Sequence, residues 1–366
     1  MNPFIHRRNA INLTEENGRE GLPCNGRTAV ISRRAFVGGA ALSIAMPSLV
    51  RAQTSRTLKI SHQFPGGSID QGDFRDRLCR KFAAEVESRT KGALKFEIYP
   101  GSSLMKTNAQ FSALRKGALD LSLYPLPYAG GEVQALNLGL MPCLVTTYEQ
   151  GAKWKNAPIG KALSKIAEDK GVKFISWVWQ AGGIASRFSP IRLPEDVKGL
   201  KIRGGSREMD LMLAAAGGQV STMPSNEIYL GMQTGALDAA LTSSTSLISF
   251  RLEELAKSLT TARVESIWFM CEPLLMSKAI FDSLPADQQK IILDVGAEME
   301  AFGAASAKYD DQEVAKVYAA KGAAVIDLTA ADLAKWRAIA EASAWKDFSS
   351  KSPEAAELLA SARSIA

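Results

Sequence analysis

Hydrophobic and polar residues follow two spacings along this chain, one typical of strands and the other of helices. Residues 94–99 alternate apolar and polar side chains and stop at Pro100 and Gly101, which predicts a β-strand. Between residues 74 and 89, apolar side chains recur at every fourth position, which places them on one face of a predicted helix. Each such element has an apolar face, so it needs a second layer to pack against.

The two patterns alternate along most of the chain. Further strands are predicted at residues 58–61, 119–123, 172–177, 200–203, 236–241 and 274–276, and further helices at 108–116, 208–216, 225–235, 286–321 and from 330 onward. Regular alternation of strands and helices predicts the α/β class, with sheets covered by helices. The length of 366 residues favours two domains.

The N-terminus carries an export pattern. The paired Arg33 and Arg34 precede a moderately apolar, Gly- and Ala-rich stretch at residues 37–46, and a small-residue cleavage site follows at residues 50–52. This pattern predicts a twin-arginine signal peptide over residues 1–52 and a protein exported to the periplasm. An uncleaved membrane anchor is the alternative, but the apolar run of about 15 residues is shorter than the roughly 20 that span a bilayer.

Charge and residue counts argue against several function classes. The net charge is +6, but residues 1–52 hold seven Arg against three Glu, which leaves 37 basic and 35 acidic residues in the rest of the chain. A basic nucleic-acid-binding face is therefore not expected. The four Cys form no C-x-x-C pair, and only His62 remains after the leader, so we expect no metal and no cofactor. No G-x-S-x-G turn supplies a serine nucleophile, which makes an exported hydrolase the weaker alternative.

Three local patterns carry the functional interpretation. The first is L-P-E-D-V-K-G-L-K-I-R at residues 193–203. The second, at residues 223–238, and the third, at residues 111–121, share a helix–Gly–x–Leu–Asp–strand plan. Arg203 ends a predicted strand and is followed by two glycines, so its guanidinium is expected at the strand-end edge where open α/β sheets bind ligands.

With these motifs the chain, from about residue 58 to about residue 340, resembles the DctP-like solute-binding proteins of tripartite ATP-independent periplasmic (TRAP) transporters. The resemblance implies a two-lobed periplasmic-binding-protein fold of the α/β class, with a hinge and a long lobe-bridging helix. It implies lobe I at residues 53–179 plus 268–308 and lobe II at residues 180–267 plus 309–366. It also implies a monomer that does no chemistry, captures a carboxylate-bearing small molecule and delivers it to the membrane subunits of a TRAP permease.

Arg203 is the main site residue that the resemblance implies, as the partner of the ligand carboxylate. A planar guanidinium presents two parallel N–H donors to a carboxylate, which lysine does not. The alternative is an arginine buried in a salt bridge inside one lobe. Sialic-acid-binding members carry a second arginine at the position of Gly183 here, and the nearest arginine, Arg187, lies four residues later. This departure argues against a two-arginine clamp and a sialic-acid ligand, and leaves Arg187 as a candidate.

Further ligand-binding candidates are polar or aromatic side chains that the motif positions place near strand ends. They are Gln63, Tyr124, Tyr128, Ser206, Ser225 and Thr242. Trp179 and Phe269, near the predicted lobe crossings, are candidates for an aromatic wall, with hydrophobic packing as the alternative. His62 either contacts the ligand or caps its strand.

The sequence leaves the ligand and the final role open. A 2-oxo acid, a dicarboxylate, an aromatic acid and a sugar acid all fit a single arginine anchor, with or without a cation. A receptor that reports the same solutes to a sensor kinase fits the same residues. A basic run on the helix at residues 74–89 is expected to form a solvated face, with a contact to the permease as the alternative: Arg75, Arg77, Arg80 and Lys81.

Overall fold

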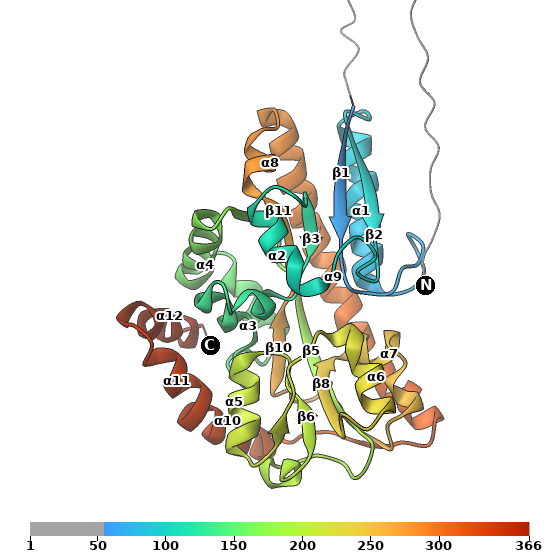
Figure 1. The fold of residues 1–366 in the computed structure, drawn as a ribbon, viewed down its shortest axis with the longest axis vertical. Helices are drawn as coiled ribbons and strands as arrows, with labels where there is room; N and C mark the ends of the chain where they lie inside the picture. Colours follow the sequence, from blue (N-terminus) through green and yellow to red (C-terminus); the bar gives the residue numbers. More distant parts are fainter. Residues whose placement is uncertain (1–54, 366) are drawn as a thin grey trace, which may run out of the picture. The chain divides into compact units, whose positions relative to one another are not determined.

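The computed structural model describes residues 55–365, which contain two β-sheets joined by two crossing segments (Figure 1). The predicted signal peptide at residues 1–52 and its cleavage site lie outside the described residues. Within the described part, no helix combines the length and the apolar character needed to cross a bilayer.

The first lobe is built on a five-stranded sheet in the order β2-β1-β3-β11-β4. These strands are β1 (Arg56–Ser61), β2 (Leu94–Tyr99), β3 (Leu121–Leu123), β4 (Val172–Ser176) and β11 (Leu274–Ser277). Helix α1 (Phe74–Arg89) packs on β2 and buries the four apolar positions that the sequence pattern predicts. The remaining helices of this lobe are α2 (Thr107–Arg115), α3 (Tyr148–Trp154), α4 (Pro158–Asp169), α8 (Lys278–Asp282), and the 3₁₀ helices η1 (Leu126–Ala129) and η2 (Gln134–Leu140).

The second lobe is built on a seven-stranded sheet in the order β12-β9-β5-β8-β6-β7, with β10 paired to β5. These strands are β5 (Trp179–Ser186), β6 (Lys201–Arg203), β7 (Gln219–Val220), β8 (Ala239–Ser243), β9 (Ser258–Thr260), β10 (Trp268–Cys271) and β12 (Ala324–Ile326). Its helices are α5 (Arg207–Ala215), α6 (Ile228–Gln233) and α7 (Ser244–Ser249), with the 3₁₀ helices η3 (Pro194–Val197), η4 (Ser225–Glu227) and η5 (Leu252–Glu254). All eight residues of β5 are buried, so this strand has no solvent-facing side and shows no alternation of apolar and polar positions.

Two elements connect the lobes. The crossing segments, residues 177–178 and 272–273, touch each other, because the backbone N–H of Glu272 donates to the carbonyl of Val178 at 2.7 Å. Helix α9 (Ala286–Ala320), 35 residues long, packs on α1 and β4 in the first lobe and on α7 and β12 in the second (Figure 1). The predicted α/β two-lobed fold with a hinge and a long lobe-bridging helix is therefore confirmed.

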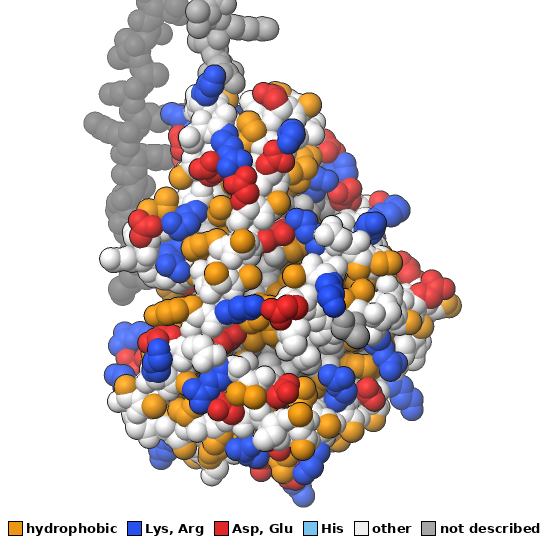
Figure 2. All heavy atoms as spheres, turned by 180° about the vertical axis from the view of Figure 1, so that it is seen from behind, with side chains coloured by type: hydrophobic (Ala, Val, Ile, Leu, Met, Phe, Trp, Pro, Cys, Tyr) orange, Lys and Arg blue, Asp and Glu red, His pale blue; other side chains and the backbone are white. Residues whose placement is uncertain are grey.

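The C-terminal helices contact both lobes. α10 (Ala330–Ala340) packs on α5 and continues through a π-helical turn (Glu341–Trp345) into α11 (Lys346–Ser349), whereas α12 (Pro353–Arg363) packs on α4. Strand β10, which the predicted boundaries assign to lobe I, pairs with β5 in the second sheet. The predicted residue boundaries, 53–179 plus 268–308 for lobe I and 180–267 plus 309–366 for lobe II, stay a prediction. Figure 2 shows basic and acidic side chains interspersed on the face it presents, in line with the nearly even counts after residue 52.

Candidate functional site

The turn after β6 fixes the position of Arg203. β6 ends at this arginine, Gly205 follows with a φ of 99°, and Ser206 caps α5 by accepting a hydrogen bond from the Met209 N–H at 3.0 Å. A Cβ atom on Gly205 would lie 2.7 Å from Nη1 of Arg203. The turn therefore requires glycine both for its left-handed backbone and for the space that the guanidinium occupies.

The Arg203 side chain is buried, with 1% of its surface exposed, and its contacts are all to neutral oxygens. Nε donates to the Met223 carbonyl at 3.1 Å, Nη1 to the Leu241 carbonyl at 2.8 Å and Nη2 to the Tyr128 hydroxyl at 2.6 Å. Among the described residues no carboxylate oxygen lies within 4.0 Å of its nitrogens, so the alternative of a salt bridge inside one lobe is not found. A guanidinium has five N–H donors, and two of them, one on each Nη, have no partner here.

Tyr128 brings the two lobes together at this point. It lies on η1 of the first lobe, and its hydroxyl accepts hydrogen bonds from Arg203 and from the backbone N–H of Ser225 at 3.1 Å, both in the second lobe. Because both contacts use oxygen lone pairs, the hydroxyl hydrogen of Tyr128 is left to donate. The spare donors of Arg203 and Tyr128 together suit an anionic oxygen.

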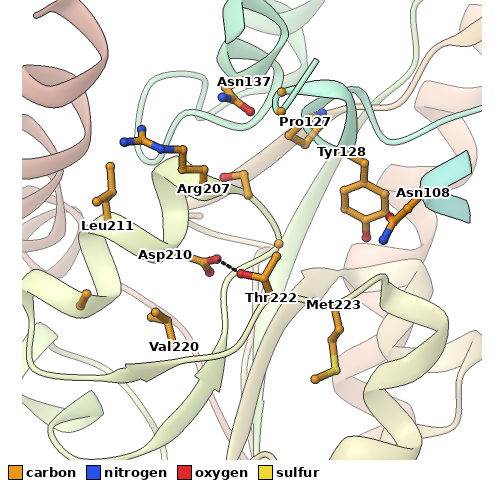
Figure 3. Close-up of a pocket in the computed structure, with 15 residues that line it drawn as sticks. Asn108, Pro127, Tyr128, Asn137, Arg207, Asp210, Leu211, Val220, Thr222 and Met223 are labelled. Carbon is orange, nitrogen blue, oxygen red and sulfur yellow. Dashed lines mark hydrogen bonds between the residues drawn. The ribbon is translucent and has the colours of Figure 1, made fainter. Parts of the chain in front are cut away.

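A cavity of about 480 Å³ lies between the lobes beside this pair. Figure 3 shows Tyr128 and Asn108 of the first lobe on one side of it, and Asp210 and Leu211 of α5 on the other. Two of the predicted residues, Tyr128 and Ser206, line the cavity. The volume falls in the range of small-molecule sites, and the wall combines apolar surface with a few polar groups, as such sites do.

Asp210 holds the loop that carries the site. Its carboxylate accepts hydrogen bonds from the Gly204 N–H at 3.2 Å and from the Thr222 hydroxyl at 2.8 Å. Burial raises the pKa of Asp210 above its ordinary value, and the hydrogen bond from Thr222 and the charge of Arg203 oppose that rise. Asp210 thus orders the turn through these hydrogen bonds. Its carboxylate also interacts electrostatically with Arg203, although the two side chains form no ion pair.

Gln63 and Tyr124 are buried in the first lobe and each keeps a polar group without a partner among the described residues. Gln63, which follows β1, is buried and accepts a long hydrogen bond of 3.5 Å from Thr107, while its Nε2 has no partner among the described residues. Tyr124, which follows β3, is fully buried, and its hydroxyl also lacks a partner there. The ring of Tyr124 packs edge-on against Tyr128 at 6.1 Å, and burial raises its pKa, which keeps the hydroxyl protonated. Buried donors without partners mark places where a ligand or water completes the hydrogen bonds.

The remaining polar candidates contribute through the backbone or to inter-lobe contacts. Thr242 is buried in β8. It follows Leu241, whose carbonyl accepts the hydrogen bond from Nη1 of Arg203. Ser225 binds Tyr128 through its backbone N–H. The Ser206 hydroxyl, besides capping α5, donates to the Leu140 carbonyl of the first lobe at 3.0 Å.

His62 is committed to internal contacts of the first lobe. Its Nε2 lies 3.1 Å from Oδ1 of Asp76, and its Nδ1 accepts from the Phe64 N–H at 3.3 Å, so both ring nitrogens are used. Burial raises the pKa of Asp76, but hydrogen bonds from His62, Arg80 and Gly67 outweigh it and leave that pKa lowered. The structure therefore favours the structural interpretation of His62 over ligand contact.

Trp179 and Phe269, the predicted aromatic wall, pack against other aromatic rings and do not line the cavity described above. Trp179 packs against Trp154, with ring centroids 5.1 Å apart, and Phe269 against Tyr148 at 4.8 Å, in a cluster beside α3. Trp268, one residue before Phe269, instead donates its ring N–H to the Gly204 carbonyl at 2.9 Å, next to Arg203. Neighbouring residues of a strand face opposite sides, and the sequence does not tell which side faces the site.

Arg187 lies apart from Arg203 in the structure. It is one-third exposed and lies 4.0 Å from Oδ1 of Asp238, whose other oxygen accepts the backbone N–H of Lys201. Lys201 begins β6, and Arg203 ends it, so the two arginines lie at opposite ends of the strand.

Arg75, expected on a solvated helix face, is buried with 1% of its surface exposed. The expectation was wrong because α1 turns its first residues toward the second lobe, where Arg75 donates to Ser243 at the end of β8 and to Ser246 and Ser249 of α7. Arg80 and Lys81 stay partly exposed and pair with Asp76 and Asp70. The acid two residues before Arg75 was the available signal, because an adjacent carboxylate permits burial of a guanidinium.

Residues 73–351 match the family of bacterial extracellular solute-binding proteins, family 7 (DctP). A solute-binding protein of Albidiferax ferrireducens is 62% identical over 327 residues, covering 89% of this chain and 96% of that protein. The C4-dicarboxylate-binding periplasmic protein DctP of Rhodobacter capsulatus is 26% identical over 309 residues, covering 83% of this chain and 90% of that protein.

Solved structures of solute-binding proteins are also similar to this chain. A crystal structure of a TRAP periplasmic solute-binding protein from Rhodoferax ferrireducens with bound malonate is 63% identical, has a TM-score of 0.83, and covers 84% of this chain and 98% of that one. DctP7 of Bordetella pertussis, a receptor binding pyroglutamic acid, shares the fold with a TM-score of 0.76 at 22% identity, covering 84% of this chain and 100% of that one. The chain belongs to the DctP family of bacterial extracellular solute-binding proteins.

Proposed function

We propose that this protein captures a small carboxylate-bearing solute between its lobes, with Arg203 as the anchor, and delivers it unchanged to a TRAP permease. The observation that carries the proposal is the buried Arg203 guanidinium, which has two unused N–H donors and no carboxylate within 4.0 Å in the described part of the chain. A buried cation without a counter-ion is costly, and a ligand carboxylate relieves that cost.

The surroundings of Arg203 support the same function. The free hydroxyl hydrogen of Tyr128, the unpartnered Nε2 of Gln63 and the hydroxyl of Tyr124 add donors for the oxygens of a small acid. The relative with bound malonate and the C4-dicarboxylate-binding relative point to short dicarboxylates as the first ligands to try. We further infer export to the periplasm behind the leader at residues 1–52, and a monomeric binding protein.

The test is binding by the mature chain, residues 53–366. Malonate, succinate, pyroglutamate and the neutral malonamide are titrated by calorimetry, and thermal unfolding is recorded at each saturation. A ligand present at a hundred times its Kd stabilises by about 2.7 kcal/mol, enough to raise Tm by a few degrees. We expect a rise with at least one acid and none with malonamide.

The anchor is tested with Arg203→Ala and a matched control, Arg187→Ala. Losing one partner of a buried charge pair costs about 2–5 kcal/mol, so Arg203→Ala should weaken acid binding by about 30-fold or more. Arg187→Ala should bind as the wild type does, because Arg187 lies at the other end of β6. Binding by Arg203→Ala within threefold of wild type, or a response to malonamide equal to that of malonate, contradicts the proposal.

A further inference from the structure

A second buried arginine lies where the lobes meet. Arg75 is the second residue of α1, a first-lobe helix that begins after Asp73. Its guanidinium faces the start of α7, which follows β8 in the second lobe. Glu272 of a crossing segment lies 3.6 Å away, so this one side chain touches both lobes and the hinge.

Contacts within the first lobe hold the guanidinium in place. Nε and Nη2 donate to the two carboxylate oxygens of Asp73 at 2.9 and 2.7 Å, and the guanidinium carbon lies 3.7 Å from the centre of the Phe64 ring. Asp73 also caps α1 by accepting the Arg75 N–H at 2.9 Å. A bidentate pair on a helix cap leaves the guanidinium little freedom to turn, so its outer edge is oriented in advance.

That outer edge binds the second lobe. Nη1 donates to the hydroxyls of Ser246 at 2.9 Å and Ser243 at 3.3 Å, and Nη2 donates to Ser249 at 3.4 Å. With the two bonds to Asp73, these contacts use all five N–H donors of Arg75. The Glu272 carboxylate in turn accepts a hydrogen bond from the side-chain amide of Gln180 on β5. This bond extends the network into the second sheet.

We propose that Arg75 is a positioning residue that fastens the second lobe to the first and stabilises the lobe-closed form. When the lobes separate, the contacts to Asp73 and Phe64 stay inside the first lobe, whereas those to Ser243, Ser246 and Ser249 cross the cleft and break. This role concerns closure and does not require that Arg203 bind a carboxylate.

Ser246→Ala tests the proposal, because it removes the shortest cross-lobe contact of Arg75 and keeps both the Arg75–Asp73 pair and the capping hydroxyl of Ser243. Spin labels at Lys95→Cys and Lys198→Cys, both exposed and on opposite lobes, report the distance between the lobes, while the native Cys79, Cys143 and Cys271 are buried. The matched control is Ser258→Ala, a buried serine whose hydroxyl donates at 3.0 Å to Phe188 inside the second lobe. Label distances are recorded without ligand and with malonate, and malonate affinity is measured for each protein.

We expect the ratio of open to closed molecules to rise about tenfold in Ser246→Ala, or malonate binding to weaken by the same factor, because a hydrogen bond to a charged donor is lost. Ser258→Ala should match the wild type in both readouts. Equal label distances and equal malonate affinities in Ser246→Ala and wild type overturn the proposal. Failure of malonate to bind any of the proteins counts against the proposed function alone, because the distances are also recorded in its absence.

Discussion

Arg75 and Arg203 are both 1% exposed and both lie between the lobes, yet their partners differ. Arg75 uses all five N–H donors and faces a carboxylate at 2.7 Å, whereas Arg203 uses three, all on neutral oxygens. Burying a cation without an anion in contact is expensive, so the first arrangement is complete by itself and the second lacks a contacting anion. The comparison assigns the satisfied guanidinium of Arg75 to the structure and supports the proposal that the unsatisfied one of Arg203 binds the ligand.

The largest expected difference is in stability. Arg75→Met leaves the Asp73 carboxylate, which is 0% exposed, without its partner, so we expect the free energy of unfolding to fall by about 3–5 kcal/mol. Arg203→Met removes hydrogen bonds to two carbonyls and to the Tyr128 hydroxyl, which keeps its bond from Ser225, and should cost about 1–2 kcal/mol in the ligand-free protein. Urea unfolding of both variants measures the two losses. Equal losses would show that Arg203 is as structural as Arg75 and break the comparison.

A smaller effect separates Tyr128 from its neighbour Tyr124. Tyr128→Phe removes the hydroxyl that accepts from Arg203 at 2.6 Å and joins the lobes, and it should weaken acid binding about tenfold, the usual loss for a hydrogen bond to a charged group. Calorimetric titration with malonate measures it. Tyr124→Phe is the comparison variant, because its hydroxyl, a proposed ligand donor, has no hydrogen bond to Arg203 or to the second lobe, and its removal should weaken binding less. A greater loss of malonate affinity in Tyr124→Phe than in Tyr128→Phe would contradict the assignment of the Arg203–Tyr128 pair as the carboxylate-binding group.

The smallest effect concerns pH on the Arg75 side. Burial raises the pKa of Glu272 from 4.5 to about 7, although the charge of Arg75 opposes the rise. Between these values the unfolded chain releases the proton and the folded protein keeps it, so stability falls as pH rises from about 5 to 7 and then levels off.

Glu272→Gln isolates this contribution. The unfolding free energy of the wild type should decline more than that of Glu272→Gln between pH 5 and pH 8. Glu208, whose pKa burial also raises to about 7, is present in both proteins and cancels in the difference. Urea unfolding at each pH measures the difference, and parallel pH profiles would show that Glu272 releases its proton alike in the folded and unfolded chain.

Local sequence predicted some parts of this protein to the residue. α1 and β2 have the predicted bounds, because their spacing of apolar side chains is regular and a turn residue ends each element. β5 was missed, because it is buried at every position and so shows no alternation, and because its adjacent Gly182 and Gly183 favour a turn in the sequence. The motifs placed Arg203 at a strand end, and the structure put Tyr128 beside it.

Positions that depend on which way an element faces were harder to predict. Trp268 and Phe269 are neighbours on β10, yet only Trp268 contacts the turn after Arg203. Arg75 shares a helix with Arg80 and Lys81 but is buried, because the second lobe covers only the start of α1. The spacing within α1 does not contain that information, and the only local signal is Asp73 at its N-cap.

The sequence by itself determined the α/β class, the order of most elements, the family and the arginine at the end of β6. These follow from local spacing and short motifs, which act over a few residues. Only the tertiary structure decided which polar groups are left without partners, that Arg187 stays apart from the site, and that Arg75 spans the cleft. Such properties arise from contacts between residues far apart in the chain, as between Arg75 and Ser246, and such pairs carry no local signature.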